Sequence, residues 1–65
     1  MTALQLKDAL FAEWSAARAE ANLAYDAWCE SPGAHSYAVY RAAEDRADAA
    51  EAELATFTAG ALILV

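Results

Sequence analysis

The chain has 65 residues, and its 10 acidic against 4 basic side chains give a formal net charge of −6. This excess of acid argues against a nucleic-acid partner, because such binding relies on lysine and arginine to neutralise phosphates. One cysteine and one histidine exclude an internal disulfide and a zinc site built from the usual ligands, so we predict no metal and no cofactor. A chain this small has little core, and we expect self-association to stabilise it.

The first predicted helix spans about residues 3–30. Thr2 followed three residues later by Gln5 matches a capping box, which satisfies free backbone donors of a first helical turn. Alanine occupies 20 positions and favours helix, and no proline or glycine interrupts the chain before Pro32-Gly33. Proline disfavours helix in the residue before it and glycine reaches positive φ at little cost, so the predicted turn covers about residues 31–35.

The second predicted helix spans about residues 36–59. Gly60 is the first residue after the turn that could end it, which leaves residues 60–65 as an apolar tail. Together the two helices and the turn predict one domain over residues 1–65.

Apolar residues in both helices alternate spacings of four and three, which is the pattern of a two-stranded coiled coil. Folding the chain at the turn opposes large residues to large ones and alanine to alanine along this seam. The predicted fold is therefore all-α, an antiparallel two-helix hairpin of the alanine-rich coiled-coil kind. The seam residues are Leu10, Trp14, Ala17, Ala21, Ala24, Trp28, Tyr40, Ala43, Ala47, Ala50, Leu54 and Phe57.

A second apolar face lies beside the seam, and a single hairpin would leave it in water. Two hairpins packed through this face would enclose a four-helix core, so we predict a homodimer. The alternative is that these are scattered surface side chains that need no partner. Arg18, Glu44 and Glu51 cross the middle of the face, which is apolar at its ends. The predicted face consists of Leu4, Phe11, Tyr25, Tyr37, Leu62, Ile63 and Val65.

Charged residues beside the seam favour the antiparallel pairing only modestly. In this register Arg18 approaches Glu51 and Glu20 approaches Arg46, whereas Glu13 faces a like charge on Glu53. Exposed ion pairs contribute about 0.2–1 kcal/mol each, so packing has to specify the register.

The apolar tail allows three interpretations. It packs on the second hairpin, it is captured by another protein through its terminal carboxylate, or it frays or marks a truncated longer chain. It is too short to cross a bilayer, which takes about 20 apolar residues, and we expect no membrane partner.

Residues able to carry chemistry are few. Cys29 and His35 flank the turn, but a nucleophile needs an oriented base and a pocket that excludes water, and a helical hairpin offers neither. We therefore predict that the chain is not an enzyme. The second helix carries frequent acidic side chains: Glu44, Asp45, Asp48, Glu51 and Glu53. A solvated face explains them more simply than a cation site, because the Glu-x-x-His pair of helical metal sites is absent.

A dimerising antiparallel hairpin of this length resembles the Rop family of small plasmid regulators, which bind paired RNA loops. The resemblance implies a bundle. It does not extend to RNA binding, because that family uses a basic and aromatic face and no face here carries clustered lysine or arginine.

The sequence therefore predicts a non-enzymatic interaction or scaffold protein that self-associates. The alternative function is an acidic regulator, similar to an antitoxin, that occludes a basic partner. A protein partner could use the acidic surface or the apolar tail. No secretory signal is visible and the cysteine is unpaired, so we expect a cytoplasmic location.

Overall fold

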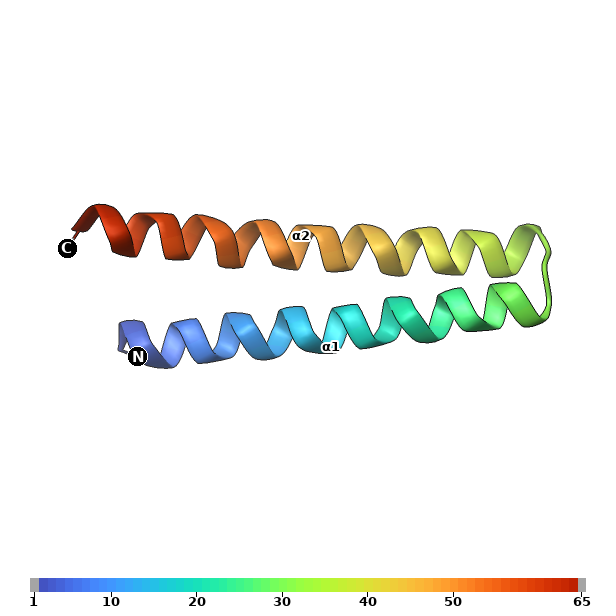
Figure 1. The fold of residues 1–65 in the computed structure, drawn as a ribbon, viewed down its shortest axis with the longest axis horizontal. Coiled ribbons are helices and arrows are strands. Elements are labelled where there is room, and N and C mark those ends of the chain that lie inside the picture. Colours follow the sequence, from blue (N-terminus) through green and yellow to red (C-terminus); the bar gives the residue numbers. More distant parts are fainter. Residues whose placement is uncertain (1, 65) are drawn as a thin grey trace.

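The computed structural model describes residues 2–64, and the side chains of residues 2–60. Two helices, α1 (Ala3–Glu30) and α2 (Ala34–Leu64), run antiparallel along a hairpin measuring 48 × 17 × 14 Å. Figure 1 shows the helices side by side over their length, with the turn at one end and the described ends of the chain at the other. The all-helical, two-helix architecture predicted from the sequence is confirmed, and no strand occurs in residues 2–64.

The start of α1 is the predicted capping box. The Gln5 backbone N–H donates to the Thr2 hydroxyl over 3.1 Å, and the Thr2 backbone N–H donates to Gln5 Oε1 over 2.8 Å. Each residue satisfies a backbone donor of the other, which is why α1 begins at Ala3.

The turn is shorter than predicted. α2 begins at Ala34 because the Gly33 carbonyl already accepts the Tyr37 backbone N–H over 3.0 Å. The Ser36 hydroxyl donates to the carbonyl oxygens of Ser31, at 2.8 Å, and Gly33, at 3.2 Å, and so ties α2 to the end of α1. Gly33 has no positive φ, so the expectation that it would use its conformational freedom was wrong.

The C-terminal end of α2 also differs from the prediction. The helix runs through Gly60 to Leu64 and does not stop near residue 59. A glycine without positive φ can remain in a helix at a cost of about 1 kcal/mol relative to alanine, and here it does. Leu62 and Ile63 belong to the backbone of α2, their side chains lie outside the described residues, and Val65 lies wholly outside them.

The core between the helices is thin and made of alanine. Within the described residues the four buried side chains are Ala21, Ala43, Ala47 and Ala50. Small side chains let the helices approach closely but bury little apolar area each, so the packing stabilises the hairpin weakly for its length. The remaining seam residues are half-buried: Leu10, Trp14, Ala17, Ala24, Trp28, Tyr40, Leu54 and Phe57.

Candidate interaction surfaces

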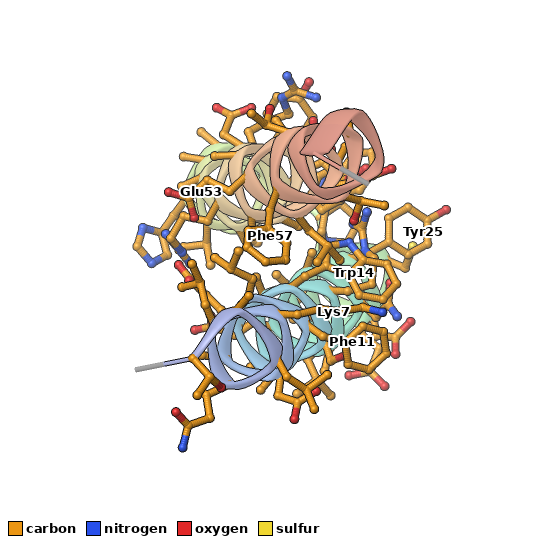
Figure 2. The ribbon with its side chains drawn as sticks, turned by 90° about the vertical axis from the view of Figure 1, so that its left-hand side faces the viewer. Lys7, Phe11, Trp14, Tyr25, Glu53 and Phe57 are labelled. Atoms are coloured by element: carbon orange, nitrogen blue, oxygen red, sulfur yellow. The ribbon has the colours of Figure 1, made fainter. Side chains whose placement is uncertain are left out.

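The hairpin has two long edges, one on each side of the seam, with different chemistry. Viewed along the helices, Phe11 and Tyr25 project from one edge, and Glu53 lies on the other (Figure 2). Residues seven apart share an edge in a coiled coil, so each edge can be followed along both helices. The aromatic flank is Leu4, Phe11, Arg18, Tyr25, Tyr37, Glu44, Glu51 and Thr58; the acidic flank is Leu6, Glu13, Glu20, Val39, Arg46 and Glu53.

Near the turn, two rings of the aromatic flank, Tyr25 and Tyr37, form a cluster with two rings of the seam, Trp28 and Tyr40. Trp28 stacks on Tyr40 with the centroids 5.6 Å apart and the planes at 4°. Tyr37 meets Trp28 edge-on at 5.2 Å, and Tyr25 meets Tyr40 in the same way at 5.4 Å. Such pairs contribute about 0.5–1.5 kcal/mol beyond the area they bury. The cluster holds Tyr25 and Tyr37 in place, although both remain exposed to solvent.

At the opposite end of the aromatic flank, Phe11 packs on Trp14. Their ring centroids are 5.6 Å apart, and Phe11 still exposes 55% of its surface. The indole nitrogen of Trp14 is buried without a hydrogen-bond partner in the single chain. In the view along the helices, the Lys7 side chain extends to the same side of the hairpin as Phe11 and Trp14 (Figure 2).

The centre of the aromatic flank is an ion pair across the two helices. Arg18 Nη2 donates to Glu44 Oε2 over 2.7 Å, and the two side chains are 32% and 23% exposed. This hydrogen bond raises the pKa of Arg18, and the charges of Glu44, Asp48 and Glu51 add to the rise against a smaller opposing effect of burial. The sequence pattern predicted Glu51 as the partner of Arg18, but Glu44 takes that position.

The acidic flank is a shallow groove floored by small residues. Its volume is about 490 Å³, and Glu13, Glu20 and Glu53 rim it together with Arg46. The predicted approach of Arg46 to Glu20 is confirmed at 3.9 Å, a long and exposed pair. The sequence analysis did not predict this groove, although its signal was present in small residues on and next to the seam: Ala16, Ala17, Ala49 and Ala50.

The residues weighed for chemistry, Cys29 and His35, belong to neither flank, although Cys29 lies beside Tyr25 of the aromatic flank. Cys29 carries a free, exposed thiol, and His35 is exposed after the turn. Neither a hydrogen bond nor an ion pair joins these two side chains in the described part of the chain. The described part of the chain also contains no group of three or more histidine, cysteine, aspartate or glutamate side chains arranged to hold a metal ion.

Neither helix, over the part of the chain that the structure describes, is long and apolar enough to cross a membrane. No family model matches the chain, and no curated protein or solved structure matches it significantly.

Proposed function

We propose that this chain is a non-enzymatic interaction protein that pairs with a second copy of itself through the aromatic flank, forming a four-helix bundle. One observation carries the proposal: Phe11, Tyr25 and Tyr37 are exposed along a single edge, while the only buried side chains among the described residues are alanines. Burying a large apolar side chain contributes about 1.5–3 kcal/mol. Covering this edge would therefore add more stability per residue than the buried alanines of the seam provide.

The dimensions of the hairpin suit such an interface. Each hairpin offers an edge 48 Å long and 14 to 17 Å wide. A stable interface buries about 800 Å² on each partner, and an edge of these dimensions is of that order. A second hairpin also brings an identical set of rings, so the apolar ends of the flank can meet apolar ends in a symmetric dimer.

Sedimentation equilibrium of the purified chain at micromolar concentrations tests the proposal. We expect a mass twice that of the chain, both at low salt and near 1 M salt, because apolar packing is not screened by ions. A helical monomer at every concentration would overturn the proposal, as would a dimer that dissociates when salt is added.

The alternative, an acidic regulator that occludes a basic protein, has support of its own in the acidic flank. Three glutamates rim a groove in which only Arg46 supplies positive charge. The probe is a lysine-rich helical peptide, and its affinity should fall steeply with salt. Glu13→Gln combined with Glu20→Gln should weaken this binding, with Glu30→Gln, outside the groove, as the matched control. If the peptide bound the parent chain, the double variant and the control with equal affinity, the groove would be excluded as the binding surface.

A further inference from the structure

The charged centre of the aromatic flank distinguishes the two ways in which two hairpins can dock symmetrically. In α1, Phe11, Arg18 and Tyr25 follow one another at intervals of seven residues, about 10 Å each. In α2, Glu44 and Glu51 are spaced in the same way, and both contribute charge at Arg18. Because Glu44 takes the hydrogen bond from Arg18, Glu51 remains without an ion pair within the described chain.

The first docking puts both turns at the same end of the bundle. Helix α1 of each copy then lies on α2 of the other, and the antiparallel register brings Arg18 between Glu44 and Glu51 of the second copy. The second docking puts the turns at opposite ends, so that α1 lies on α1 and α2 on α2. Arg18 then meets the second copy's Arg18, and Glu51 meets the second copy's Glu51.

The rings at the ends of the flank do not separate these dockings. With the turns together, Tyr25 lies between Tyr37 and Glu44 of the second copy; with the turns apart, it faces the second copy's Phe11. Both arrangements bury aromatic surface. The central charges therefore decide, because like charges placed together in a partly desolvated interface cost free energy that opposite charges do not.

We propose that two copies dock with their turns at the same end, each Arg18 lying between Glu44 and Glu51 of the other copy. This inference rests on the proposed self-association. It adds an orientation, and it gives Glu51 a partner in the second copy that the single chain does not provide.

The native cysteine provides a direct test. Cys29 is the single cysteine, it is exposed, and it lies 11 residues beyond Arg18, about 16 Å along α1. A spin label on Cys29, measured by pulsed dipolar spectroscopy, should give a distance within about 30 Å, set by the width of the bundle. Docking with the turns apart would separate the labels by about 33 Å along the axis, and the width of the bundle adds to this distance.

The outcomes separate this inference from the proposed function. A labelled dimer with the short distance supports both. A labelled dimer with the long distance overturns the orientation and leaves self-association standing, whereas a labelled monomer, with the unlabelled chain also monomeric, overturns both.

A charge-neutral variant gives a second, label-free test with opposite signs. Glu51→Gln removes an attraction if the turns lie together and a repulsion if they lie apart. We expect its dimer dissociation constant to rise about threefold to tenfold. Glu53→Gln, the same change two residues away on the acidic flank, is the control for net charge. A dissociation constant for Glu51→Gln lower than that of the control would overturn the proposed orientation.

Discussion

The two flanks differ in how much large apolar side chain they expose: the aromatic flank exposes Leu4, Phe11, Tyr25 and Tyr37, whereas the acidic flank exposes Leu6 and Val39. Tyr37 on the aromatic flank and Val39 on the acidic flank are 46% and 45% exposed in the single chain. Tyr37 belongs to a ring cluster that continues toward an internally paired arginine, whereas Val39 precedes a groove rimmed by glutamates. Residues of equal exposure therefore differ in their surroundings, and the continuity of the rings is the reason for which we propose the aromatic flank as the docking surface.

The largest effect is expected where the aromatic flank joins the seam. Trp14→Ala removes a half-buried indole and the support of Phe11, and should lower the free energy of unfolding by about 3–5 kcal/mol. Thermal melts at a fixed chain concentration measure this loss. Leu23→Ala is the control, because Leu23 is 69% exposed, and its melting temperature should stay close to that of the parent. An unshifted melt for Trp14→Ala would contradict its place in the core.

The next effect separates the flanks directly. Phe11→Ser should raise the dimer dissociation constant about tenfold or more, because it removes a large exposed ring from the proposed contact. Val39→Ser removes apolar surface from the acidic flank and should leave the constant unchanged. Both are measured by sedimentation, with far-UV circular dichroism to verify helix content. If Val39→Ser weakened the dimer more than Phe11→Ser, the acidic flank would be the interface.

A smaller change tests whether α2 continues as a helix past the position where the sequence predicted its end. An added Cβ at Gly60 meets no atom within 4 Å, and the residue lies inside α2. Gly60→Ala should therefore stabilise the chain by about 0.5–1 kcal/mol. Chemical denaturation measures the gain. Gly33→Ala, a substitution in the turn, serves as the comparison. If Gly60→Ala did not raise the free energy of unfolding, the helix would end before residue 60.

The smallest effect concerns the ionisation of Tyr25. A side-chain hydrogen bond with Cys29 raises the pKa of Tyr25 above its ordinary value, and nearby charge and burial add to the rise. The folded chain thus favours the neutral phenol, so this stabilisation is present below about pH 10 and is lost as the pH rises through the raised pKa. Cys29→Ala should move one phenolate absorbance transition to lower pH. An unchanged titration curve would remove Cys29 as the cause.

The hairpin could be predicted from the sequence because the apolar residues that hold its helices together recur at regular spacings. Alternating spacings of four and three place Trp14 and Trp28 on one stripe, and the Thr2–Gln5 capping box and Pro32 mark the start and end of α1. The exact bounds of the helices could not be predicted in this way, because they depend on local contacts that a periodic pattern does not reveal. The start of α2 follows from hydrogen bonds of Ser36 and Gly33 across the turn.

The candidate surfaces were predictable in part, for a similar reason. Heptad spacing in an antiparallel hairpin is enough to place Phe11, Tyr25 and Tyr37 on one edge. The ion-pair partner of Arg18 could not be predicted in this way. The antiparallel register places the Arg18 side chain between two glutamates, and its rotamer determines that Glu44 accepts the hydrogen bond. Predicting the groove of the acidic flank also requires the distance between the helices, and this distance depends on the alanines of the core.

The most direct test of self-association through the aromatic flank is nuclear magnetic relaxation with an inert paramagnetic probe dissolved in the solvent. It compares the ring protons of Tyr37 with the methyl protons of Val39, two residues of nearly equal exposure in the single chain. We expect the probe to relax Val39 strongly and Tyr37 weakly at concentrations where the chain is dimeric, and to relax both strongly on dilution. Equal relaxation at all concentrations, or protection of Val39 in place of Tyr37, would show that the second copy does not cover the aromatic flank.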